Sequence, residues 1–67
     1  MQIFVNGDKH QLTTGNRLSD LSKELGIEEA IGVAIAVENK VVPKNQWNEF
    51  ELQENVNILV IRAAQGG

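Results

Sequence analysis

The sequence has no cysteine, which excludes disulfide bonds, thiolate catalysis and cysteine-based zinc sites. Its single histidine, His10, has no second ligand at metal-binding spacing, so we expect a solvent-facing strand residue rather than a metal ligand. Its longest apolar stretch, residues 31–37, is broken by Gly32, whereas a membrane span needs about 18 residues. The first residues also lack the basic start and long apolar core of a signal peptide. We therefore expect a soluble, cytoplasmic domain with no membrane partner.

Basic residues are few and scattered, with 6 Lys and Arg against 9 Asp and Glu and a net charge of −3. No basic stripe that could follow a phosphate backbone is present, so nucleic acid is not an expected partner. The carboxylate pairs Glu28–Glu29 and Glu49/Glu51 are interpreted as solvated surface, because a domain this small offers no cleft for acid–base catalysis. The glycines match no phosphate-binding loop. We predict that the chain is not an enzyme and binds no cofactor itself.

The chain begins with a predicted hairpin. Residues 2–5 alternate as a strand, with Ile3 and Val5 on one face. Asn6-Gly7 is the strongest short signal for a type I′ turn, since that turn needs positive φ at both central residues. A second strand is expected over residues 9–13, with Leu12 pointing inward.

One helix follows, because Leu18, Leu21 and Leu25 share a helical face and Gly26 suits the position after the helix end. Either Asn16 or Ser19 fits the N-cap. Beyond the helix, the pattern predicts a central strand, a turn at 38–40, a short edge strand ended by Pro43, an irregular segment fixed by Trp47 and Phe50, and a last strand. The central strand is expected over residues 33–37, the edge strand over 41–42, the irregular segment over 45–51 and the last strand over 56–62.

These elements predict an α+β domain over residues 1–62, in which one helix covers one face of a four- or five-stranded sheet. The opposite sheet face remains open and displays Phe4, Leu59 and Ile61, together with Ala34 and Ala36. Exposed apolar side chains are common on any protein surface. Three large ones on adjacent strands favour a partner-docking patch.

Residues 63–67 lose the strand alternation and form a small, uncharged end, Ala-Ala-Gln-Gly-Gly. We expect an extended, flexible tail that spans about 17 Å and presents one reactive group, the α-carboxylate of Gly67. Chain ends also fray without any function. The composition alone leaves both interpretations of the Gln65-Gly66-Gly67 end open.

The whole chain resembles the ThiS family, the sulfur carrier proteins of thiamine (thiazole) biosynthesis, which have the ubiquitin-like β-grasp fold. The resemblance rests on the Met-Gln-Ile…Asn-Gly start, on the helix with Leu18 and Leu21, on Ala-Ile-Ala-Val followed by Val42-Pro43-Lys44…Trp47, and on the Gly-Gly end. Members of the family usually have Asn directly after the Ala-Val strand, where this chain has Glu38.

The resemblance implies that an E1-like enzyme of the ThiF type, using ATP and magnesium, adenylates the carboxylate of Gly67. Sulfur from cysteine, supplied through a desulfurase, then gives a C-terminal thiocarboxylate that is passed to a thiazole synthase of the ThiG type. The chain alone is expected to be a monomer. Three alternatives remain: a small subunit of molybdopterin synthase, a ubiquitin-like protein modifier and an interaction domain with an inert tail.

Overall fold

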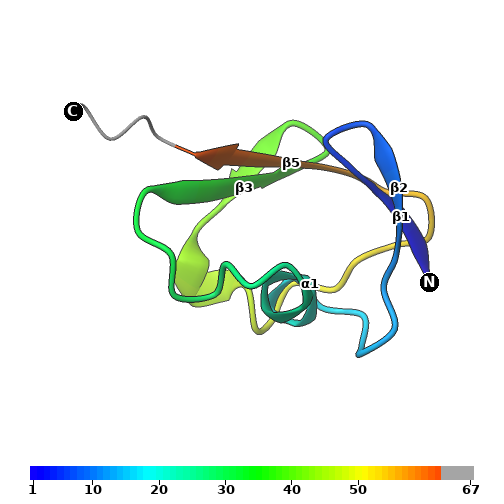
Figure 1. Ribbon diagram of the computed structural model, residues 1–67, viewed down its shortest axis with the longest axis horizontal. Coiled ribbons are helices and arrows are strands. Elements are labelled where there is room, and N and C mark those ends of the chain that lie inside the picture. Colours follow the sequence, from blue (N-terminus) through cyan, green and yellow to red (C-terminus); the bar gives the residue numbers. More distant parts are fainter. Residues whose placement is uncertain (63–67) are drawn as a thin grey trace.

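A computed structural model describes residues 1–62, so the predicted tail at 63–67 lies outside the described residues. One five-stranded sheet, in the order β2-β1-β5-β3-β4, packs one face on the helix α1, as predicted (Figure 1). Within the described residues, no helix is long and apolar enough to cross a membrane. The elements are β1 (Gln2–Val5), β2 (Asp8–Gln11), α1 (Leu18–Glu24), β3 (Val33–Val37), β4 (Lys40–Val42), the 3₁₀ helix η1 (Lys44–Gln46) and β5 (Asn57–Arg62).

The predicted hairpin is confirmed. Asn6 and Gly7 have φ of 52° and 87°, the left-handed pair that a type I′ turn requires. The strand after the turn begins one residue earlier and ends two residues earlier than predicted, and Leu12 is nonetheless buried just after it. A second turn of the same kind joins β3 to β4, where Glu38 and Asn39 have φ of 49° and 70°.

The helix begins differently from the prediction, because its N-cap is Arg17 rather than Asn16 or Ser19. The Asp20 carboxylate accepts the Arg17 backbone N–H at 3.0 Å and so satisfies this end of the helix. At the other end Gly26 has φ of 71°, and Ile27 N–H donates to the Ser22 carbonyl at 2.9 Å, which is the Schellman arrangement. The predicted role of Gly26 is therefore confirmed.

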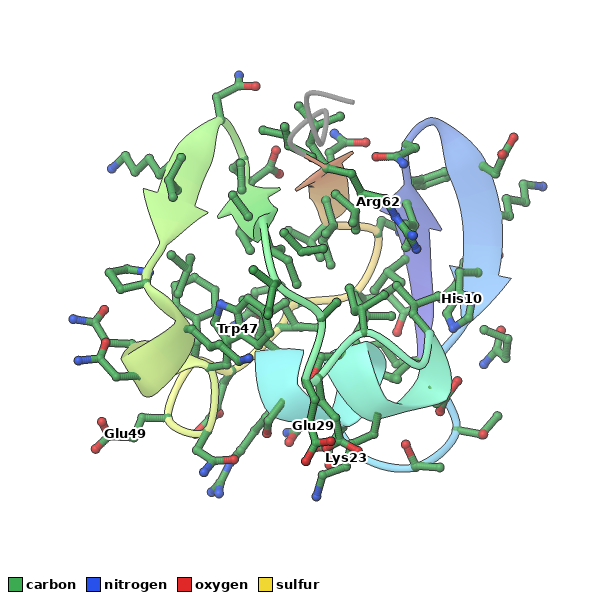
Figure 2. All side chains as sticks on the ribbon, turned by 60° about the vertical axis from the view of Figure 1, so that its left-hand side comes forward. His10, Lys23, Glu29, Trp47, Glu49 and Arg62 are labelled. Carbon is green, nitrogen blue, oxygen red and sulfur yellow. The ribbon has the colours of Figure 1, made fainter. Side chains whose placement is uncertain are left out.

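The core lies between the sheet and α1. The helix contributes Leu18 and Leu21, both 0% exposed, and β1, β3 and β5 contribute Ile3, Ile35 and Ile58. The irregular segment after β4 closes one end of this core. There Trp47 is buried and its Nε1–H donates to the Val42 carbonyl at 2.9 Å, which explains the Val-Pro-Lys…Trp spacing (Figure 2). The other large core residues are Leu12, Ile27, Val37, Val42, Leu52 and Val56.

The first and last strands lie side by side and parallel at the centre of the sheet. Phe4 is aligned with Asn57 and Val5 with Ile58, whereas β3 runs antiparallel to residues 58–62 of β5. This topology carries the end of β5 to one edge of the domain (Figure 1).

Candidate functional site

Arg62 is the last described residue, five positions before Gly67. The predicted sulfur-carrying residue Gly67 and its neighbours Gln65 and Gly66 therefore lie outside the described residues. The structure shows where the segment that bears them begins, namely at the end of β5, beside β3.

The sequence predicts a docking patch on the sheet face opposite α1, and the side chains lie on the face expected for it. Leu59 and Ile61 are 49% and 42% exposed, whereas Ile58 on the other face is 3% exposed. Phe4 is half-buried and does not belong to the core cluster, unlike its neighbours Ile3 and Val5. The predicted alternation along β1 and β5 is confirmed.

A further apolar residue belongs to this open face. Val41 on β4 is 65% exposed and pairs with Ala36, which in turn pairs with Leu59 on its other side. Cross-strand partners point to the same face of a sheet, so Val41 extends the row across three strands. We call Phe4, Val41, Leu59 and Ile61 the open-face patch. Ala36 itself is 5% exposed, so the expectation that it is displayed is wrong, because its larger neighbours cover it.

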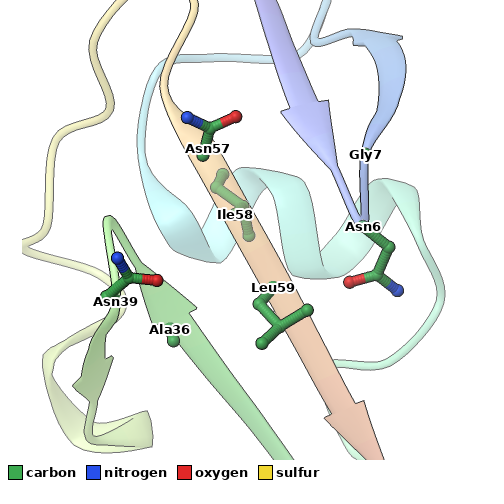
Figure 3. Close-up of a pocket in the computed structure, with 7 residues that line it drawn as sticks. All are labelled: Asn6, Gly7, Ala36, Asn39, Asn57, Ile58 and Leu59. Atoms are coloured by element: carbon green, nitrogen blue, oxygen red, sulfur yellow. The ribbon is translucent and has the colours of Figure 1, made fainter.

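A shallow hollow of about 280 Å³ adjoins the open-face patch between the two hairpin turns (Figure 3). Side-chain amides of three asparagines surround an apolar floor that includes Leu59. A surface of this kind, apolar in the middle and polar at the rim, has the layout of a protein-binding site. The lining residues are Asn6, Gly7, Ala36, Asn39, Asn57, Ile58 and Leu59.

The prediction that His10 faces solvent is wrong. His10 pairs with Ile3 across the hairpin and therefore points to the helix side, where its Nε2 lies 3.1 Å from Glu24 Oε1. The other carboxylate oxygen of Glu24 accepts the backbone N–H groups of Thr13 and Thr14, each at 2.9 Å, and both threonine hydroxyls. These hydrogen bonds, led by that of the Thr13 N–H, lower the pKa of Glu24 from 4.5 to about 2.

This arrangement is structural, because it ties the loop after β2 to the end of α1. No group of three or more histidine, aspartate or glutamate side chains within residues 1–62 is arranged to hold a metal ion. The carboxylates of Glu28, Glu29, Glu49 and Glu51 are all exposed, in agreement with the expectation of a solvated surface.

Comparisons with known proteins give both the fold and the family of the chain. The crystal structure of the thiamine biosynthesis protein ThiS from Geobacter metallireducens has a TM-score of 0.81 at 16% identity, and the match covers 100% of both chains. The domain therefore has the β-grasp fold. The chain matches the ThiS family over residues 2–67. The sulfur carrier protein ThiS of Escherichia coli (strain K12) is 31% identical over 67 residues, which are 100% of each chain. The chain belongs to the ThiS family.

Proposed function

We propose that the chain is a sulfur carrier protein whose C-terminal carboxylate, that of Gly67, is converted to a thiocarboxylate for thiazole formation in thiamine biosynthesis. The observation that carries the proposal is the family match, which runs from residue 2 to residue 67 and so includes the Gly-Gly end. The Escherichia coli relative, a sulfur carrier protein whose whole length is covered, supports the same role.

The chemistry of the proposal needs two steps at one carbon atom. A carboxylate is a poor acyl donor, so an E1-like adenylating enzyme of the ThiF type first joins a Gly67 oxygen to the α-phosphorus of ATP, and pyrophosphate leaves. A thiol reductant then releases sulfide from the persulfide that a desulfurase forms from cysteine, and the thiol becomes a disulfide. The sulfide attacks the acyl carbon and AMP leaves. The thiocarboxylate that results is delivered to a thiazole synthase of the ThiG type.

The carrier supplies no catalytic group in this scheme, and ATP and magnesium bind to the partner. We propose that the chain acts in the cytoplasm as a substrate of its partner enzymes rather than as an enzyme. Its contribution is to present Gly67 on a narrow chain end and to dock. The docking surface we propose is the open-face patch, in which the predicted residues Phe4, Leu59 and Ile61 lie on one face with Val41.

Mass spectrometry of the intact chain tests the proposal. Incubation with its adenylating enzyme, ATP, magnesium and a sulfide source should raise the mass by about 16 Da, as one oxygen is replaced by sulfur. Deletion of Gly67 should abolish the shift without changing the fold, because the core lies within residues 1–62. An unchanged mass shift in the deletion variant would exclude Gly67 as the modified residue. A ladder of adducts joined from Gly67 to protein lysines would instead favour a protein modifier.

A further inference from the structure

The last strand continues beyond the strand that pairs with it. Parallel pairing between β1 and β5 ends at Val5 and Ile58, where β1 turns away, whereas β5 continues to Arg62. Asn6 extends the pairing by two hydrogen bonds, one made by its backbone and one by its side chain. Its backbone N–H donates to the Ile58 carbonyl at 2.8 Å, and its side-chain Oδ1 accepts the Val60 N–H at 2.8 Å.

Within the described residues, no strand pairs with this edge of β5 beyond Asn6. Successive residues of a strand direct their backbone groups to opposite sides. The Asn57 carbonyl accepts the Glu38 N–H on the β3 side, so the backbone groups of Val60 and Arg62 point to the β1 side. Within residues 1–62, neither the Val60 carbonyl nor the Arg62 N–H has a hydrogen-bond partner on that side.

The open edge borders a hollow of about 390 Å³ on the helix side of the sheet, in which four of the six lining residues are aliphatic. Its walls come from the end of β1, the end of β5 and the segment after α1, and Arg62 extends from β5 toward β1 at its rim (Figure 2). This hollow lies on the opposite side of the sheet from the open-face patch. Its lining residues are Val5, Asn6, Leu25, Ile27, Val60 and Arg62.

We propose that the enzyme acting on Gly67 adds an extended segment to this edge, which makes the inference dependent on the proposed function. The segment pairs with the Val60 carbonyl and the Arg62 N–H and places an aliphatic side chain in the hollow. Added strands gain affinity from main-chain hydrogen bonds and specificity from pockets for alternate side chains, and both are present here.

The short distance from the end of β5 to Gly67 favours the enzyme as the partner that supplies this segment. Five residues span at most about 17 Å, so a catalytic centre that reaches Gly67 must lie close to the end of β5. The chain's own end is a poorer candidate, because folding it back along β5 would place Ala63-Ala64 in a tight turn that favours Gly, Asn or Asp.

Hydrogen exchange of the labelled full-length chain, alone and bound to its adenylating enzyme, tests the pairing. We expect the Arg62 amide to exchange at least about tenfold more slowly in the complex. Ile61, whose N–H points to β3, is the internal control and should change by less than about threefold. An Arg62 amide that exchanges equally fast in both states overturns the proposal. Slow exchange of the Arg62 amide in the free chain also overturns the proposal. If that protection depends on protein concentration, a second copy occupies the edge; if it does not, the chain's own end occupies it.

Variants provide a second measurement. Arg62→Pro removes the N–H at an edge position that tolerates proline, and Leu25→Phe fills the hollow. Each should weaken binding to the enzyme at least about tenfold, whereas Arg62→Ala, which keeps the N–H, should cost less than about threefold. Thermal unfolding checks that each variant folds. If Arg62→Pro and Leu25→Phe fold and bind as wild type does, the proposal is wrong. If the wild-type chain gains no mass with enzyme, ATP and sulfide, the proposed function itself fails.

Discussion

The side chain of Asn6 takes the place of a strand residue beside Val60. Its Oδ1 accepts the Val60 N–H at 2.8 Å, although Asn6 already belongs to the turn and has φ of 52°. One residue therefore serves both the hairpin and the junction between the first and last strands. Asparagine suits both tasks, since it tolerates the left-handed region and carries an acceptor three bonds from its Cα.

Substitution of Asn6 separates these two roles. Asn6→Asp keeps an acceptor and should change the free energy of unfolding by less than about 0.5 kcal/mol. Asn6→Gly keeps the turn but loses the acceptor and gains backbone freedom in the unfolded state, so it should cost about 1–2 kcal/mol. Urea unfolding measures both, and the Val60 amide should exchange faster only in Asn6→Gly. Equal stability of the two variants would contradict the role assigned to the side chain.

Glu24 makes the stability of the domain depend on acid. Its pKa is lowered from 4.5 to about 2 by the hydrogen bonds of Thr13, Thr14 and His10, so the folded state holds the proton less tightly than the unfolded state. This contribution is complete above about pH 4.5 and is lost as the pH falls toward 2. The melting temperature should therefore fall over this window, and Glu24→Gln should reduce that fall.

Glu28→Gln is the matched control, because Glu28 is an exposed carboxylate close by in the chain. Circular dichroism melts at several pH values between 6 and 2 compare the three proteins. The control should keep the wild-type slope. A slope that is the same in Glu24→Gln as in wild type would show that these hydrogen bonds do not govern the acid response.

Local patterns predicted the parts of the fold that local chemistry decides. Asn6-Gly7 predicted its turn, and alternation along β5 predicted which side chains face α1. The N-cap could not be predicted, because Asn16 is a better cap than Arg17 by residue type, but its carbonyl accepts the distant Leu52 N–H at 2.7 Å. A contact between residues far apart in the chain decided that helix start.

The same reason explains the errors at the site. The sequence does not show which of Val41 and Val42 is buried. The register of β3 and β4 decides this, because it places Val42 beside the buried Ile35 and so leaves Val41 on the exposed face. His10 was predicted to face solvent because a polar strand residue usually does. Its partner Glu24 lies 14 positions away on α1, and that contact allows His10 to face the helix.

Glu38 occupies a left-handed position that its side chain does not favour. It has φ of 49° at the first of the two central positions of the turn, where Asn, Asp or Gly is preferred. Glu38→Asn should therefore raise the free energy of unfolding by about 0.5–1 kcal/mol. For a domain of this size, that corresponds to a rise of about 2–8 °C in melting temperature. Exposed Glu49→Asn is the control for the loss of charge and should not raise the melting temperature.

The two faces of β5 should respond oppositely to mutation. Ile58 is 3% exposed in the core, so Ile58→Ala should cost about 2–4 kcal/mol of unfolding free energy. Leu59 and Ile61 are 49% and 42% exposed, so Leu59→Asp and Ile61→Asp should stay within about 1 kcal/mol of wild type, since a hydrated charge costs little. Thermal and urea unfolding measure these differences.

Binding distinguishes a docking patch from ordinary surface. If the adenylating enzyme covers Leu59 and Ile61, each Asp variant buries an unpaired carboxylate, which should weaken binding at least about tenfold, or about 1.4 kcal/mol. Val41→Asp tests whether the contact extends to β4, and Asn48→Asp, at an exposed position beside α1 and away from this face, is a control for added negative charge. Calorimetric titration of the folded variants gives the affinities. If the variants at 59 and 61 bind as the wild type does, the enzyme recognises the chain without this face. If Asn48→Asp weakens binding equally, charge rather than apolar contact is responsible.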